Sequence, residues 1–174
     1  MKTVRMLCSV ALAAVFTHLV LGQEGKSANI APIPAAIPAA QKVFISNAGE
    51  DNVGGDLYSG AQDRCYNDFY RQVRTMNRFE LVAAPSDADI ILEITMTSSA
   101  LPSDVMTGST VPGAGYESIF RLRVLDPKSQ VVLWTFYERV APAVLKMNRN
   151  KNFDNALKQI VSDLSNLTPN GPRP

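Results

Sequence analysis

Apolar residues recur along this chain with two different spacings. Between Asp56 and Met76 they step by four residues, which predicts a long helix with one buried face. The apolar positions of that helix are Leu57, Ala61, Cys65, Phe69 and Val73. From Ile90 to Thr97 apolar and polar residues alternate instead, which predicts a strand with one face in the core. The chain therefore combines helices and strands.

The remaining periodic segments predict four more strands and a second helix. These are short strands at 42–47 and 78–82, a hairpin over 116–140, and a closing helix along 153–167 that follows the polar stretch KMNRNKN. In the hairpin, Phe120, Leu122 and Val124 must pair with the apolar residues of the return strand, because a shift of one residue would reverse the faces. The numbers of two directly opposed residues therefore sum to an even value, as in Leu122 with Trp134. An even sum predicts an odd-length turn, of three or five residues, at 126–130.

The order of these elements predicts an α+β domain. We expect a two-layer sandwich, with a mixed sheet of about five strands and two long helices on one face. The predicted organisation is a signal peptide at 1–22, a tether rich in proline and alanine at 23–41, a single globular domain at 42–168, and a disordered tail at 169–174.

The first 22 residues have the charge pattern of an export signal. Lys2 and Arg5 precede the uncharged apolar run 6–21, and Gly22 suits cleavage after it. An uncleaved anchor is the alternative. Cys8 lies near the start of the apolar run and not after it, where a lipidated cysteine would stand, so we expect no lipid anchor and a periplasmic or secreted protein.

Removal of this leader also removes the residue type that most often acts as general base and metal ligand, and with it any intramolecular disulfide. His18 and Cys8 are both in the leader, which leaves no histidine and only Cys65. The leader carries two basic residues and no acidic one, so 17 Lys and Arg become 15 against 16 Asp and Glu, a formal charge of −1. This balance disfavours nucleic acid as a partner. We expect no metal and no other cofactor. Cys65 is expected to face the core. Asp87 and Asp89 are expected to stabilise a turn before the following strand.

Three features are candidates for an interaction surface. The polar face of the first helix carries four arginines: Arg64, Arg71, Arg74 and Arg78. A long loop at 98–115 carries four apolar residues: Leu101, Val105, Met106 and Val111. Tyr137 marks the solvent side of the hairpin. For the arginine face the alternative is an ordinary solvated helix face, and for the loop it is a segment folded over the sheet edge.

The chain resembles a group of bacterial envelope domains. The segments that carry the resemblance are KVFISN, SDADIILEITM, RLRVLDPKSQVVLWTFYERV and NFDNALKQIVSDLSNL. The group comprises the periplasmic domain of curli secretion (CsgG-like), the lipoprotein activator of penicillin-binding proteins (LpoB-like), and the amino-terminal domain of the TolB translocation protein. The resemblance implies a non-enzymatic module that binds other envelope components.

Three function classes follow. The first is a non-enzymatic exported interaction or scaffold protein of the cell envelope, with an envelope protein as partner and a homo-oligomer also open. The alternative is a module for a small molecule or glycan, using the 98–115 loop and the hairpin face. The third is a hydrolase that uses two carboxylates, drawn from Asp87, Asp89, Glu93, Glu117 and Glu138.

Overall fold

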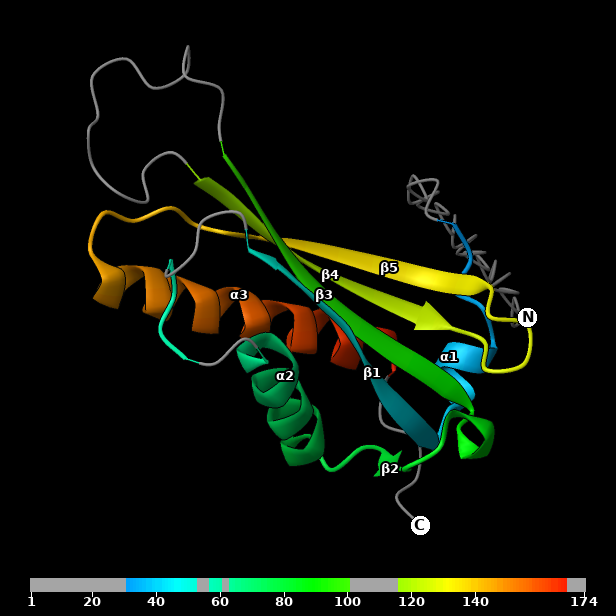
Figure 1. Ribbon diagram of the computed structural model, residues 1–174. Helices are drawn as coiled ribbons and strands as arrows, with labels where there is room; N and C mark the ends of the chain where they lie inside the picture. Colours follow the sequence, from blue (N-terminus) through cyan, green and yellow to red (C-terminus); the bar gives the residue numbers. More distant parts are fainter. Residues whose placement is uncertain (1–30, 53–56, 61–62, 101–115, 169–174) are drawn as a thin grey trace, which may run out of the picture. The chain divides into compact units, whose positions relative to one another are not determined.

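The computed structural model describes residues 31–52, 57–60, 63–100 and 116–168 (Figure 1). The chain divides into two compact units, 1–31 and 32–174, and the second contains every helix and strand given below. The predictions for the leader, for the first part of the tether (23–30), for residues 101–115 of the predicted loop and for the tail fall outside the described residues.

The centre of the domain is one mixed sheet of five strands in the order β2-β1-β3-β4-β5. Their bounds are β1 Lys42–Asn52, β2 Glu80–Leu81, β3 Ile90–Ala100, β4 Tyr116–Leu125 and β5 Val132–Val140. Strand β1 runs parallel to β2 and β3, whereas β3, β4 and β5 are successively antiparallel.

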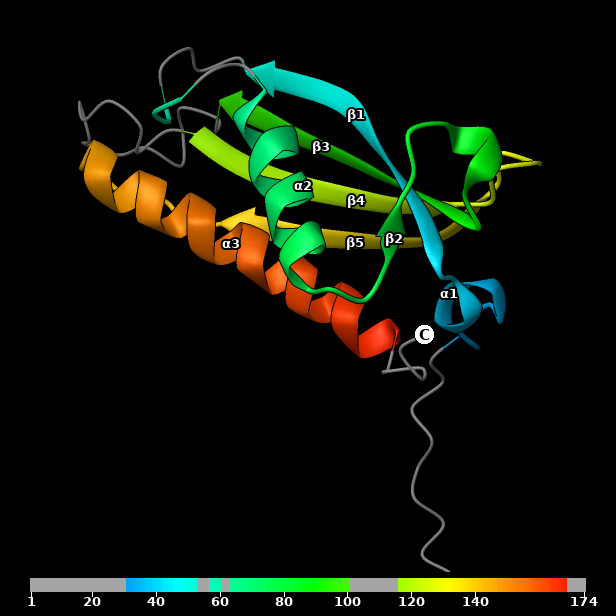
Figure 2. The same ribbon diagram turned by 90° about the horizontal axis from the view of Figure 1, so that it is seen from below.

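Two helices, α2 (Arg64–Thr75) and α3 (Lys146–Leu167), lie on the same face of this sheet (Figure 2). Helix α2 packs over β1 and β3, and α3 packs over β5 and β4. The core between them is formed by fully buried side chains, the largest of which include Phe69, Leu92, Phe120, Leu122, Phe153 and Leu157. The predicted α+β class, with a mixed five-stranded sheet and two helices on one face, is confirmed.

Helix α2 is shorter than predicted, because it begins at Arg64 and not at Asp56. Gly60 has a φ of +120°, a conformation that other residues rarely adopt and that does not occur in a helix. At the other end Met76 is the C-cap and Asn77 has a φ of +50°, which ends the helix in the left-handed region.

Helix α3 is longer than predicted. The stretch KMNRNKN forms its first two turns, so the helix begins at Lys146. These turns lack an apolar stripe because their contacts are polar: Arg149 Nε donates to the Leu57 carbonyl (2.8 Å) and Asn150 Nδ2 to Ser59 Oγ (2.9 Å). Hydrophobic periodicity could not detect such turns.

Strand β1 continues past the predicted end at Asn47 through a one-residue bulge. Asn47 pairs with Ile94, and the next paired residue, Glu50, lies beside Met96. Gly49 has a φ of +84°, which favours glycine, and its carbonyl accepts a hydrogen bond from Thr95 Oγ1 (2.8 Å). The extra residue turns Glu50 toward α2, although the alternation would otherwise place it on the opposite face.

The hairpin keeps the predicted faces but reaches them differently. Leu122 pairs with Phe136 and Val124 with Trp134, so the numbers of opposed residues do sum to an even value. The partner of Leu122 lies two residues further along β5 than in the pairing of Leu122 with Trp134. The predicted odd-length turn is wrong. The amide of Asp126 bonds the carbonyl of Val131 across four turn residues, and a bulge after Val124 restores the even register.

The core begins before residue 42. A short helix, α1 (Ala36–Ala39), and a 3₁₀ turn, η1 (Pro85–Asp87), complete the domain. Ile37 of α1 is fully buried and belongs to the core, although proline and alanine dominate the surrounding sequence. Within the part of the chain that the structure describes, no helix is long and apolar enough to cross a membrane.

Candidate functional site

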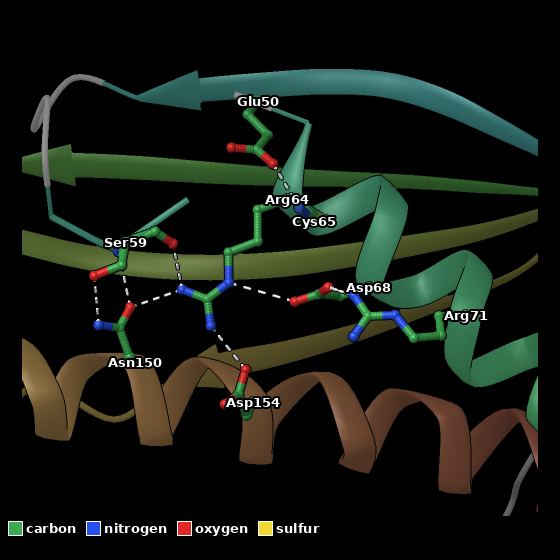
Figure 3. Close-up of polar contacts among 8 residues, drawn as sticks. All are labelled: Glu50, Ser59, Arg64, Cys65, Asp68, Arg71, Asn150 and Asp154. Atoms are coloured by element: carbon green, nitrogen blue, oxygen red, sulfur yellow. Dashed lines mark hydrogen bonds and ion pairs between the residues drawn. The ribbon is translucent and has the colours of Figure 1, made fainter. Parts of the chain in front are cut away.

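The densest polar cluster surrounds Arg64 at the start of α2 (Figure 3). One terminal nitrogen, Nη1, donates to the carbonyl of Ser59 (2.7 Å) and to Asn150 Oδ1 (2.7 Å). The other, Nη2, donates to Asp154 Oδ1 (2.8 Å), and Nε lies 3.3 Å from Asp68 Oδ2. Arg64 therefore connects α2 to α3 and to the segment 57–60.

The same guanidinium lies over an aromatic cluster. Its Cζ is 4.0 Å from the ring centroid of Phe153, which also contacts Tyr58 (5.3 Å) and Phe120 (4.9 Å). The Arg64 side chain is 16% exposed. With its donors directed at partners within the domain, it contributes to stability and offers little surface to a ligand.

The other three predicted arginines do not form one patch with Arg64. Arg71 and Arg74 are exposed on α2, and Arg71 pairs with Asp68. Arg78 lies beyond the end of the helix, where it donates to the carbonyl of Pro38 (3.2 Å) and lies over the ring of Phe79. A contact role for a basic face on α2 thus depends on Arg71 and Arg74 alone.

Cys65 lies beside Arg64 but points into the core, as predicted. Its side chain is buried, and its amide donates to Glu50 Oε1 (2.8 Å), so the bulge in β1 supplies an acidic acceptor at the first turn of α2. Burial raises the pKa of the thiol far above its usual range, and the nearby Glu50 and Asp68 carboxylates raise it further. A thiol in this state is a poor nucleophile.

The carboxylates that a hydrolase would need are dispersed. Asp89 Oδ2 accepts the amides of Gln41 (2.9 Å) and Lys42 (2.8 Å), and these hydrogen bonds lower the pKa of its carboxyl group. Burial and the nearby Asp163 raise the pKa of Glu138. Among the residues that the structure describes, no group of three or more His, Cys, Asp or Glu side chains could hold a metal ion.

The sheet face opposite the helices carries alternating charges. Glu93 pairs with Arg123 across β3 and β4 (Nε to Oε1, 2.6 Å), and Glu117 pairs with Arg139 across β4 and β5 (2.6 Å). Tyr137, the predicted contact residue of the hairpin, lies opposite Arg121 and is 66% exposed.

Four of the predicted contact residues lie outside the described residues, namely Leu101, Val105, Met106 and Val111. The strand ends that flank them, Ala100 of β3 and Tyr116 of β4, pair with each other. The use of this loop as a contact surface stays a prediction.

Comparison with known proteins shows distant structural likeness only. No family model matches the chain, and no curated protein matches it significantly. A Xanthomonas campestris protein of family DUF330 is 15% identical with a TM-score of 0.49, over 76% of this chain and 86% of that one. A PelC dodecamer of Paraburkholderia phytofirmans is 10% identical with a TM-score of 0.45, over 80% of this chain and 94% of that one. Rare lipoprotein B of Shewanella oneidensis is 16% identical with a TM-score of 0.29, over 73% of this chain and 98% of that one. With TM-scores below 0.5, these bacterial proteins assign neither a family nor a function to this chain.

Sequence reasoning missed one set of exposed apolar residues. Two of them precede α3 and the third is in its first turn, and all are exposed: Val144, Leu145 and Met147. They belong to neither the alternating pattern of the hairpin nor the apolar stripe of α3. Apolar residues outside every predicted periodic segment are the signal that would have found them.

Proposed function

We propose that this chain is a non-enzymatic exported protein of the cell envelope that binds a partner protein through the edge of its sheet. The export signal pattern at 1–22 supports the compartment. The inert Cys65 and the dispersed carboxylates favour binding over catalysis. The observation that carries the proposal is the outer edge of β5.

Strand β5 is the last strand of the sheet and nine residues long. Within residues 31–52, 57–60, 63–100 and 116–168, only β4 pairs with it. An edge strand presents backbone donors and acceptors that an incoming extended segment can pair with. The opposite edge offers much less, because β2 has only two residues.

The side chains of β5 suit an added strand. Trp134 and Phe136 face the helices and are only partly buried, although the β4 residues that they pair with, Val124 and Leu122, are fully buried. A neighbouring strand would cover the exposed parts of both rings. Tyr137 on the other face adds an exposed aromatic ring, a residue type that is enriched where proteins meet.

Natural edge strands avoid unwanted pairing with charges, prolines or bulges in their centre. The centre of β5, from Trp134 to Tyr137, has no charge and no proline, and the bulge lies at the hairpin end. The charged residues Glu138 and Arg139 follow toward the other end. This composition is typical of an edge that pairs with a partner.

Photo-crosslinking in the living cell tests the proposal. A photoreactive residue at Tyr137 is expected to capture one protein, whereas the same residue at Tyr70, an exposed tyrosine on α2, is not. A second copy of this chain in the crosslinked product would identify self-association along β5. A probe at Arg71 tests the basic face of α2 in the same experiment.

Substitution separates edge pairing from a nearby contact. Tyr137→Lys places a charge on the edge strand and is expected to reduce capture by a probe at Thr135 about tenfold, while Tyr70→Lys leaves it unchanged. If capture is absent, or if Tyr137→Lys does not reduce it, the proposal is wrong. The module for a small molecule or glycan then becomes the better hypothesis, with thermal stabilisation by candidate ligands as its measurement.

A further inference from the structure

A second surface lies at the end of the domain where β5 leads into α3. Three apolar side chains are exposed on it: Val144 (53%), Leu145 (59%) and Met147 (74%). They lie within four consecutive residues, with the exposed Lys146 between Leu145 and Met147, and we call this segment the 144–147 surface. Single exposed apolar residues are common, but three within four consecutive residues are typical of a contact surface.

The backbone of this surface is held in place by hydrogen bonds. Arg149 Nη1 donates to the carbonyls of Val144 (2.6 Å) and Ala143 (3.4 Å), and its Nε bonds to the carbonyl of Leu57. Asn152 Nδ2 donates to the carbonyl of Ala141 (2.8 Å). The exposure of the three side chains is therefore a property of a fixed segment.

Along the chain, the charged residues next to the 144–147 surface have one sign. From Ala141 to Phe153 the chain has three basic residues and no acidic one, and both Lys146 and Lys151 are exposed. The next acidic residue, Asp154, is paired with Arg64. A negative partner surface is therefore complementary to this end of the domain.

We infer that the 144–147 surface docks on an anionic lipid bilayer. Aliphatic and thioether side chains can enter the boundary between headgroups and acyl chains, and the two lysines can remain at the level of the lipid phosphates. Membrane-surface segments combine basic and apolar residues in this way, whereas the centre of a protein interface is depleted in lysine. This contact is distinct from the β5 edge proposed for a partner protein.

Vesicle co-sedimentation tests this inference. The probe is a chain that begins at Gln23, because the apolar leader would itself bind lipid and the core residues start at Ile37. Vesicles of phosphatidylglycerol mixed with phosphatidylcholine are expected to bind it about tenfold more strongly than phosphatidylcholine alone, with a loss of binding at high salt.

The structure offers matched control variants at the opposite end of β5. Val131 is 58% exposed in the hairpin, and Lys128 is exposed in the same turn. Leu145→Asp and Lys146→Glu are each expected to reduce binding to anionic vesicles, while Val131→Asp and Lys128→Glu leave it unchanged. Thermal unfolding of each variant verifies that the domain remains folded.

Three results would overturn the inference: equal binding to both kinds of vesicle, no binding to the anionic vesicles, or equal effects of the test and control variants. A photoreactive residue at Met147 that captures a protein, without vesicle binding, would assign the 144–147 surface to a protein partner instead. Failure at this surface leaves the β5 proposal intact, because neither Leu145→Asp nor Lys146→Glu alters that strand.

Discussion

The guanidinium of Arg64 lies 4.0 Å from the ring centroid of Phe153, so the first residue of α2 covers a central aromatic side chain of α3. The same guanidinium binds Asp154, the next residue along α3. One side chain thereby joins the two helices through stacking and through charge. The polar face of α2, which the sequence suggests as a basic surface, begins with a residue that belongs to the domain's interior contacts.

Replacement of Arg64 should destabilise the domain far more than replacement of an exposed arginine on the same helix. Arg64→Ala removes the partner of Asp154 and one of the donors to Asn150 Oδ1, and it uncovers Phe153, so we expect a loss of about 2–3 kcal/mol in the free energy of unfolding. The matched control, Arg71→Ala, should cost less than about 0.5 kcal/mol. Urea unfolding measures both, and equal effects would contradict the role of Arg64.

The bulge in β1 depends on Gly49. Its φ of +84° is unfavourable for other residues, although no atom lies within 4 Å of the position where a side chain would begin. Gly49→Ala should therefore destabilise the domain by about 1–2 kcal/mol through backbone strain alone. Gly49→Asn should cost less, because asparagine tolerates the left-handed region. A larger loss for asparagine than for alanine would argue against strain as the cause.

Acid should weaken the contact that Asp89 makes with the start of β1. The pKa of this carboxyl group is lowered in the folded state, so its stabilising effect is complete above the ordinary pKa of an unfolded aspartate. That effect is lost as the pH falls through the folded-state pKa. Asp89→Asn should reduce stability at neutral pH and flatten the acid limb of a plot of stability against pH. Asp87→Asn is the control, because the Asp87 carboxylate accepts a hydrogen bond from the hydroxyl of Ser86, its neighbour in the chain.

Glu138 should have the opposite dependence on pH. Burial and Asp163 raise the pKa of its carboxyl group, so the protonated form is favoured by folding. Its contribution is greatest below the ordinary pKa of an unfolded glutamate and declines as the pH rises through the folded-state value. Glu138→Gln is therefore expected to increase the unfolding free energy at pH 7 more than at pH 4. A decrease at pH 7 would contradict this expectation.

Cys65 should react with thiol reagents only when the domain opens. Its side chain is 1% exposed, and its raised pKa keeps the thiol protonated at neutral pH. We expect slow labelling by a maleimide in buffer and fast labelling in denaturant. The variant Arg64→Ala, which loosens the first turn of α2, should accelerate labelling in buffer, whereas Arg71→Ala should not.

Periodicity predicted most of the elements because buried faces leave a regular mark on the sequence. The alternation from Ile90 to Thr97 lies inside β3, and Phe153, Leu157 and Ile160 are all buried on α3 as predicted. Element boundaries were less predictable. Leu57 fits the four-residue spacing of α2 but lies in a bent segment before the helix. The backbone conformation of Gly60 prevents the helix from extending back to Leu57.

Candidate site residues were harder to predict, because surface groups have no periodicity of their own. Arg64 and Arg71 have the same residue type and share a predicted helix face, yet only Arg71 is exposed. The difference depends on α3, which brings Asn150 and Asp154 to Arg64 from positions about ninety residues away. No local pattern in α2 encodes that contact.

The sequence by itself determined the α+β class, the face of each main strand and helix that enters the core, and the inward direction of Cys65. These follow from hydrophobic burial, which acts on every apolar residue and therefore leaves a repeated signal. Only the tertiary structure decided that Arg64 binds residues of α3, that Glu50 turns toward α2, and that Val144, Leu145 and Met147 are exposed. Each of these outcomes depends on one contact or one backbone conformation, and an isolated feature of that kind produces no periodic pattern in the sequence.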